Sequence, residues 1–335
     1  MGHMGITLME DQPNEVFLEY FQYLSVIDLH LGFYNLNSRI DSILYSFRIT
    51  VDLRSTTEAY YNLITQTIFP LFYQQILHLY LRSQDIEIEQ FQNLRLLEIC
   101  HPSNAQTNVI RPEIFPYLHT LVIHHLSSKK IDKICQLVLE NGFCQLRNCR
   151  LPYIEYAKLP IHCQLHELML NRCTKTMLSV LLTNLSKLKS LNVEIHPDDS
   201  KSAFLIEKNV TGLTGLALNS NQCMSFDELE HLLAHTLNLK SLAFSTKNQQ
   251  EYLDFGRWKF ILSNFTPHLL KFHYDLLINR YPCKISETTD IDRIQNMHWL
   301  FQNVTYTEHR SYESYSWAYD FHLYTAKKNI NWTIN

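Results

Sequence analysis

A spaced pattern of leucines constrains the fold of this chain more than any other feature. The template Leu-x-x-Leu-x-Leu, with other apolar residues allowed at each fixed position, recurs nine times between residues 76 and 275. Its second position recurs every 18 to 30 residues, at Leu79, Leu97, Leu121, Cys149, Leu168, Leu191, Leu216, Leu242 and Phe272. In a short strand the second and third fixed positions point to the same side. One unit cannot bury that side alone, so nine units predict a stacked array with a continuous apolar core.

The segments between these strands carry the apolar spacing of helices. Two examples are Ile131, Ile134, Leu137 and Val138, and then Leu229, Leu232 and Leu233. The chain is therefore predicted to be α/β. Its repeats resemble the leucine-rich-repeat family, and the resemblance implies a solenoid (horseshoe) of about nine degenerate repeats over residues 76–275. Cys173 and Asn221 stand at the family's ladder position, three residues after the last anchor, whereas most other units lack a ladder residue there.

Residues 13–45 form a helical module of a different kind. Pro13 suits the start of a helix, and Glu15 and Glu19 complement its N-terminal dipole. Apolar side chains then cover more than half of the helix, at Val16, Phe17, Tyr20, Phe21, Tyr23 and Leu24. Such a helix is buried on two sides or contacts a partner. Asp28 is predicted to be the N-cap of a second helix, which keeps helical spacing through Leu29, Phe33, Leu36, Ile40 and Ile43.

The string from Pro13 to Leu24, followed by Asp28 and Leu29, resembles the F-box. Gln12 and Ile40 depart from that family's pattern, and we expect them to affect adaptor affinity. The resemblance implies that the module binds a Skp-type adaptor, and through it a cullin. It also implies that the adaptor-binding residues are Pro13, Val16, Phe17, Tyr20, Phe21, Leu24 and Leu29.

The chain is thus divided into five parts. Residues 1–12 are expected to be a flexible tail, 13–45 the F-box-like module, 46–75 a helical linker and N-terminal cap, 76–275 the repeats, and 276–335 a C-terminal cap. In the linker, Ser55 and Glu58 predict a capping box for a helix from Ala59 to about Phe69, which Pro70 would interrupt or end. The C-terminal part is rich in aromatic residues, which predict either a cap or an aromatic binding surface: Trp299, Phe301, Tyr306, Tyr312, Tyr315, Trp317, Tyr319, Phe321, Tyr324 and Trp332.

Composition argues against several classes of protein. With only seven glycines, no glycine-rich phosphate-binding motif can be written anywhere. A net charge of −4 without a Lys/Arg block argues against nucleic-acid binding. Residues 59–81 carry no charge, but their many polar side chains argue against a membrane span. Without a signal peptide, the eight cysteines are expected to be reduced thiols of a cytoplasmic or nuclear protein.

The sequence predicts no catalytic site, metal site or cofactor. No Cys-x-x-Cys pair is present to begin a zinc site. Cys149 and Cys173 stand at strand positions and are predicted to be core thiols. His162, Cys163 and His166 cluster in the sequence, but the metal-ligand spacing requires a helix where a strand is expected. A hydrolase using Cys163 and His166 is the weakest hypothesis.

The residues beside the anchors are predicted to line a concave, partner-binding face. This face is mixed in charge. Its representative residues are Tyr80, Glu98, His124, Arg150, Met169, Asn192, Asn219 and His273. The two resemblances together imply the substrate-recognition subunit of an SCF-type ubiquitin ligase, a non-enzyme that binds an unknown protein substrate. The alternative is a leucine-rich-repeat scaffold or inhibitor that binds a partner protein without any ligase.

Overall fold

The computed structural model describes residues 12–125, 128–139, 142–154, 164–197, 204–206, 208–220, 222–281, 291–313 and 316–325. The chain divides into two compact units. The first contains Met1–Leu126 and Gly142–Leu146, and the second contains Ser127–Asn141 and Arg147–Asn335. The expected N-terminal tail lies almost wholly outside the described residues.

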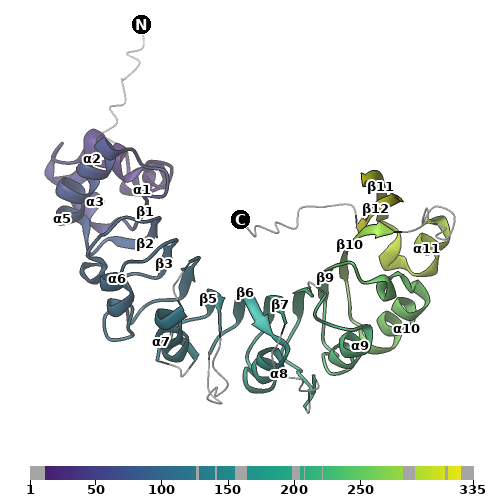
Figure 1. Ribbon diagram of the computed structural model, residues 1–335. Helices are drawn as coiled ribbons and strands as arrows, with labels where there is room; N and C mark the ends of the chain where they lie inside the picture. Colours follow the sequence, from purple (N-terminus) through teal and green to yellow (C-terminus); the bar gives the residue numbers. More distant parts are fainter. Residues whose placement is uncertain are drawn as a thin grey trace, which may run out of the picture. The chain divides into compact units, whose positions relative to one another are not determined.

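The first unit begins with three short helices, α1 (Asn14–Phe21), α2 (Val26–Phe33) and α3 (Ser38–Ser46), shown in Figure 1. Their shared core holds Phe17, Phe21, Leu29, Ile40 and Leu44, all of which are buried. Aromatic rings pack edge-on within it, which adds specific geometry to the burial of apolar area. The helical module predicted over residues 13–45 is therefore present as three helices with a core of their own.

The predicted cap of the second helix is wrong by three residues. Ser25 is the N-cap, and Asp28 is the third helical residue of a reciprocal capping box. The Ser25 hydroxyl accepts from the Asp28 N–H at 3.2 Å, while Asp28 accepts from the Ser25 N–H at 3.3 Å. The expected continuous helix through Ile43 is also interrupted, since Asn35 has a φ of 60° and Asn37 caps a new helix.

The linker contains a strand that the sequence analysis missed, β1 (Ile49–Asp52), followed by α4 (Glu58–Leu63), the π-helical turn η2 (Ile64–Ile68) and α5 (Phe69–Phe72). Thr57 precedes α4 and makes no side-chain cap, so the predicted box between Ser55 and Glu58 is not formed. Pro70 does not end the helical segment at Phe69. It lies in the first turn of α5, where its missing N–H is tolerated because the preceding turn is wide.

The remaining strands of the first unit are β2 (Ile76–Leu81), β3 (Leu96–Ile99) and β4 (Thr120–Ile123), joined through η3 (Ile88–Gln90) and α6 (Asn104–Val109). Strands β1 to β4 are parallel and follow each other in sequence order. The anchors Leu79, Leu97 and Leu121 lie directly opposite one another and are fully buried. This in-register pairing stacks the apolar side of each repeat on that of the next repeat.

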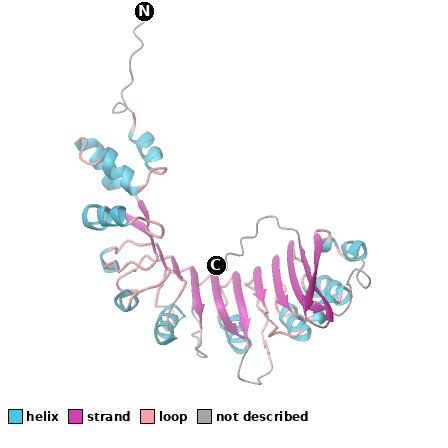
Figure 2. Ribbon diagram, turned by 45° about the horizontal axis from the view of Figure 1, so that its top comes forward, coloured by secondary structure: helices cyan, strands magenta, loops and turns pink. Residues whose placement is uncertain are grey.

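The second unit repeats this plan over six parallel strands: β5 (Asn148–Tyr153), β6 (Glu167–Thr174), β7 (Ser190–His196), β8 (Gly215–Asn219), β9 (Ser241–Lys247) and β10 (Lys271–Tyr281). Its helices are α7 (Ser128–Leu139), α8 (Lys175–Asn184), α9 (Phe226–Ala234) and α10 (Phe255–Phe265), with the short turn η4 (Gln250–Leu253). These helices lie on one side of the strands, as Figures 1 and 2 show, and no described helix of this unit covers the other side.

The predicted anchors of the second unit also pair in register. They run across the strands as Cys149, Leu168, Leu191, Leu216, Leu242 and Phe272. All but Phe272 are buried. The predicted strands and the α/β class are thus confirmed, and so are the two helical return segments named from sequence, which form α7 and α9.

The last part of the second unit contains α11 (Ile291–Met297), η6 (Trp299–Phe301) and the antiparallel hairpin of β11 (Val304–Glu313) and β12 (Ser316–Thr325). Strand β12 pairs antiparallel with β10, so the hairpin covers the edge that β10 would otherwise expose. Among the aromatic residues of this part, Phe301 is buried and Trp299 is exposed. Apart from these two and Tyr324, the tail's aromatic side chains lie outside the described structure.

Over the described residues, no helix has both the length and the apolar character that crossing a membrane requires.

Candidate functional site on the open face of the strands

The open face of the first unit is built by residues that alternate with its buried anchors. One row crosses the four strands through Asp52, Tyr80, Glu98 and Val122, which are paired in register. Parallel strands lie about 4.8 Å apart, so side chains in one row are direct neighbours. Strand pairing therefore brings together residues that are far apart in the sequence.

Arg54 is the centre of a charged cluster on this face. Its guanidinium donates to the Asp52 carboxylate at 2.6 Å and to Oε1 of Glu98 at 2.8 Å. It also lies over the ring of Tyr80, with its carbon atom 4.6 Å from the ring centroid. Hydrogen bonding from Arg54 lowers the pKa of Asp52, and burial, followed by the charge of Glu98, raises the pKa of Tyr80. This arrangement holds the Glu98 carboxylate in one position.

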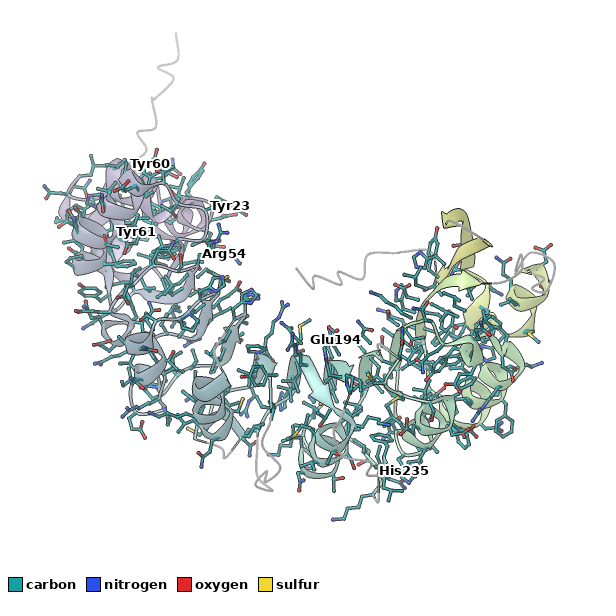
Figure 3. All side chains as sticks on the ribbon, in the orientation of Figure 1. Tyr23, Arg54, Tyr60, Tyr61, Glu194 and His235 are labelled. Atoms are coloured by element: carbon teal, nitrogen blue, oxygen red, sulfur yellow. The ribbon has the colours of Figure 1, made fainter. Side chains whose placement is uncertain are left out.

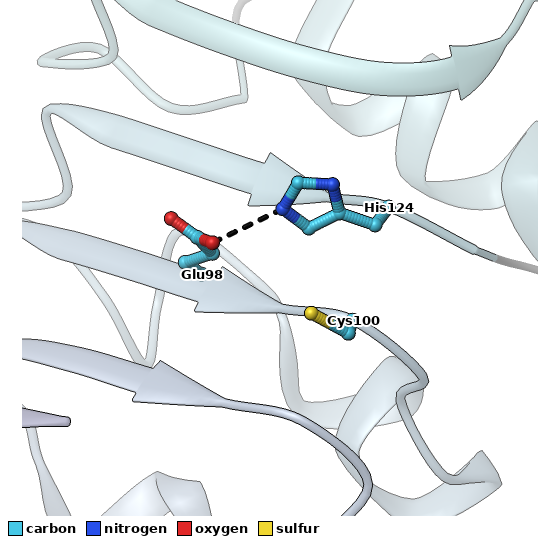
Figure 4. A group of neighbouring side chains, drawn as sticks. All are labelled: Glu98, Cys100 and His124. Atoms are coloured by element: carbon cyan, nitrogen blue, oxygen red, sulfur yellow. Dashed lines mark hydrogen bonds and ion pairs between the residues drawn. The ribbon is translucent and has the colours of Figure 1, made fainter. Parts of the chain in front are cut away.

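His124 and Cys100 extend the cluster, as Figure 4 shows. Nε2 of His124 lies 3.1 Å from Oε1 of Glu98. The Cys100 sulfur, one imidazole nitrogen of His124 and one carboxylate oxygen of Glu98 all lie within 4.8 Å of one another. The three side chains are half-buried, so they are both positioned and accessible. These donor types can bind a metal ion, which the sequence analysis did not anticipate.

Glu98, His124 and Tyr80 were predicted to lie on one face, and the structure brings them together there. Arg54 was not predicted to lie on this face, and no metal-binding role was predicted for Cys100. The useful signal is the strand register: Cys100 and His124 are the residues directly after β3 and β4. Residues at equivalent ends of adjacent parallel strands are neighbours, so the pair could have been found by aligning the repeats.

The corresponding row of the second unit runs through Arg150, Met169, Asn192, Ala217 and Ala243. The first three were predicted to bind a partner, and they are half-buried on the strand face. Alanines continue the row beyond Asn192, so the face is lined by short side chains at β8 and β9. Such a strip admits close approach of another chain.

Polar groups flank this strip. Asn219, also predicted for the face, has a buried Oδ1 atom that accepts no hydrogen bond within the described structure, and Oδ1 of Asn171 is in the same situation. Glu194 pairs with His196 at 3.2 Å and projects from the open side of the strands in Figure 3. Buried acceptors without a donor are rare, because leaving them unpaired is unfavourable.

His273 does not belong to an open face, and its assignment to the partner-binding residues is wrong for this structure. Its side chain is buried, and its Nδ1 atom lies 2.7 Å from the Thr325 hydroxyl. Thr325 is the last residue of β12, which pairs with β10. The antiparallel hairpin that covers His273 could not be read from the repeat pattern.

The predicted adaptor-binding residues separate into two groups. Phe17, Phe21 and Leu29 are buried in the core of the helical module, so they cannot contact a partner directly in this conformation. Pro13 and Tyr20 are exposed, and Val16 and Leu24 are half-buried. The exposed large apolar side chains of this module are Tyr20 at 58%, Tyr23 at 82%, Leu31 at 69%, Leu36 at 55% and Tyr45 at 46%.

The cysteine predictions agree with the structure where it is described. Cys149 and Cys173 are buried core thiols. Burial raises the pKa of Cys173 to about 12, which keeps it protonated and unreactive. His162 and Cys163 lie outside the described residues. His166 is half-buried, and burial, followed by the charge of Lys189, lowers its pKa.

A separate surface cavity of about 400 Å³ lies in the first unit, near the starts of β1, β2 and β3. Arg48 and Arg95 contribute positive charge to its lining, together with Tyr45, Gln75 and Asn93. The charged cluster around Arg54 stands at the opposite ends of the same strands. The cavity is therefore a distinct feature of this unit.

Comparison with known proteins gives no further guide to the role of these residues. No protein-family model matches the chain, and no curated protein is significantly similar to it in sequence.

Proposed function

We propose that this chain is the substrate-recognition subunit of an SCF-type ubiquitin ligase. In this proposal α1 to α3 are an F-box that docks to a Skp-type adaptor, and through it to a cullin. The strands that follow are leucine-rich repeats whose open face binds a target protein. The chain needs no catalysis of its own for this role, and it would work in the cytoplasm or nucleus.

The observation that supports the proposal best is the exposed apolar surface of the helical module. Tyr20, Tyr23, Leu31 and Leu36 remain outside although the module has its own buried core. Large apolar side chains grouped on one small module favour a protein partner. Pro13, Val16, Tyr20 and Leu24 keep their proposed contacts with the adaptor, and Tyr23 joins them. Phe17, Phe21 and Leu29 would act indirectly, by holding the helices together.

The open strand faces suit the second half of the proposal. They are mixed in charge and partly buried, and that of the second unit carries half-buried polar side chains such as Asn192 and Glu194. Such a surface favours a protein ligand bound by shape and hydrogen bonding over the phosphate backbone of a nucleic acid.

Adaptor binding is the direct test. The full chain should form a stoichiometric complex with a purified Skp-type adaptor in size-exclusion chromatography. Tyr20→Asp and Tyr23→Asp should each weaken the complex at least about tenfold, since each places a charge in an apolar interface. Tyr60→Asp is the matched control, because Tyr60 is an exposed tyrosine on α4. Absence of a wild-type complex would exclude the ligase role.

The second candidate function is a repeat scaffold or inhibitor whose N-terminal helices are only a cap. It is favoured by the packing of Tyr34 and Tyr45 on Phe72, which joins the helices to the linker below them. For the same reason, deleting residues 1–45 would expose Phe72 under either hypothesis. Adaptor binding by the intact chain distinguishes the two, because a cap should bind none.

A further inference from the structure

Three side chains of different chemistry meet at the carboxyl ends of β3 and β4. Glu98 and Cys100 are two residues apart on β3 and its extension, so their side chains share one face. His124 follows β4 and lies beside Cys100, because Ile99 pairs with Ile123. Their donor atoms are all within 4.8 Å of one another. Two adjacent strands thus bring three metal-binding groups to a single point.

The backbone that carries these groups is held by hydrogen bonds on both sides. The His124 N–H donates to the Ile99 carbonyl at 3.1 Å, and the His125 N–H donates to the Cys100 carbonyl at 2.9 Å. The Cys100 N–H donates in turn to Leu81 on β2 at 3.0 Å. The positions of the three residues are therefore fixed before any ligand binds, which reduces the entropy that binding would lose.

The donor set selects the kind of ion. A thiolate together with an imidazole and one carboxylate suits Zn²⁺ and similar transition ions, whereas Ca²⁺ and Mg²⁺ prefer oxygen ligands alone. A tetrahedral zinc site places neighbouring ligand atoms about 3.5 Å apart. The cluster needs to contract by only about 1 Å from its present limit of 4.8 Å, which side-chain rotation can supply.

Arg54 is the group that opposes a cation here. Its guanidinium donates to Oε1 of Glu98, but it also makes three contacts with Asp52, at 3.0, 3.2 and 2.6 Å. Asp52 therefore keeps Arg54 in place without Glu98. Oε2 of Glu98 has no hydrogen-bond partner among the described residues, so one carboxylate oxygen can bind a metal while the other stays with Arg54.

We propose that Glu98, Cys100 and His124 bind one Zn²⁺ or a divalent transition ion of similar preference. Three protein ligands leave a fourth position for water or for a donor atom of a bound protein. The site does not depend on the proposed ligase role, because none of the three residues belongs to the helices proposed to bind the adaptor. Failure of either proposal would leave the other standing.

Cobalt(II) is a suitable probe, because a thiolate ligand gives it a sulfur-to-metal charge-transfer band in the near ultraviolet. The full, reduced chain, first treated with a chelator, should bind one Co²⁺ with this band, and Zn²⁺ should displace it. Cys100→Ser should abolish the band. Cys144→Ser is the control, since Cys144 is an exposed thiol elsewhere in the first unit, and it should leave the band unchanged.

The other ligands are tested by affinity. Glu98→Gln and His124→Asn should each weaken Zn²⁺ binding by at least about tenfold. Loss of a residue that only hydrogen-bonds to a metal ligand already weakens binding by about that factor, and loss of a ligand should cost no less. Arg54→Gln should instead tighten binding, because it removes the competing cation. Circular dichroism of each variant checks that it folds. The proposal is overturned if wild type shows no band, if Cys100→Ser keeps it, or if Glu98→Gln and His124→Asn bind Zn²⁺ as tightly as wild type.

Discussion

Phe21 on α1 meets Phe33 on α2 edge to face, with their ring centroids 5.0 Å apart. Phe47 adds a second edge-on contact to Phe21 at 5.7 Å. The side chain that the F-box resemblance assigns to the adaptor is therefore a central part of the module's own core. Phe21 can influence the binding of a partner only indirectly, through the helices that it holds together.

Truncating Phe21 should consequently destabilise the module. We expect Phe21→Ala to lower the free energy of unfolding of α1 to α3 by about 3–5 kcal/mol, the range for large core aromatics. Hydrogen exchange of the amides in these helices measures this local free energy. Tyr23→Ala is the matched control, since Tyr23 is exposed, and it should change that value by no more than about 0.5 kcal/mol. Equal losses for the two variants would contradict the structure.

The pair of Asp52 and Arg54 should make a small pH-dependent contribution to stability. Hydrogen bonding from Arg54 lowers the folded-state pKa of Asp52, so the contribution is present above the unfolded-state pKa and is lost as the pH falls through the folded one. Both side chains are more than a third exposed, which limits the effect to about 1 kcal/mol or less.

An NMR titration of the Asp52 carboxyl carbon checks this prediction. The pKa should lie below the ordinary value of about 3.9 and should rise toward it in Arg54→Gln. An Asp52 pKa that does not respond to this substitution would mean that the ion pair does not form in solution.

The reactivity of the thiols should decrease as their burial increases. Cys144 is exposed, whereas Cys173 is buried and its pKa is raised to about 12 by that burial. We expect an alkylating reagent at neutral pH to modify Cys144 rapidly and to leave Cys173 unmodified until the chain unfolds. Mass spectrometry of peptides at successive times measures both rates. Comparable rates in the native protein would show that the strand β6 is not packed as described.

Tyr274 and Trp258 should be energetically coupled through one backbone carbonyl. The buried Tyr274 hydroxyl donates to the Tyr252 carbonyl at 2.6 Å, and the Trp258 indole N–H donates to the same oxygen at 3.1 Å. Either donor alone satisfies that oxygen. Tyr274→Phe should therefore cost only about 1 kcal/mol.

The double variant Trp258→Phe with Tyr274→Phe should cost about 1–3 kcal/mol more than the sum of the two single variants, because it leaves a buried carbonyl without a donor. Chemical denaturation of the four proteins of the cycle measures the coupling. Simple additivity would indicate that water reaches the Tyr252 carbonyl.

The strands were predictable because their signal is local. Side chains alternate along any strand. The spacing of Leu168 and Leu170, or of Leu191 and Val193, therefore predicts that both residues of each pair lie on the same, buried side. The same holds for the helical spacing in α9. The N-cap of α2 was harder, since both Ser25 and Asp28 suit that position and only the backbone conformation separates them.

Features that depend on contacts between distant segments could not be predicted from local side-chain spacing. His273 looks like any other open-face residue until β12 is placed beside β10. From the sequence alone, Phe21 is compatible with a contact to a partner or with a core position, because its burial depends on how α1, α2 and α3 pack together.

The sequence by itself determined the α/β class, the repeating strands and the apolar character of the N-terminal helices. Each of these follows from the periodicity of side chains along a few neighbouring residues. Only the tertiary structure decided that Glu98, Cys100 and His124 form one cluster beside Arg54. Their meeting depends on the register between strands more than twenty residues apart in the chain, which the hydrogen bonds between those strands establish.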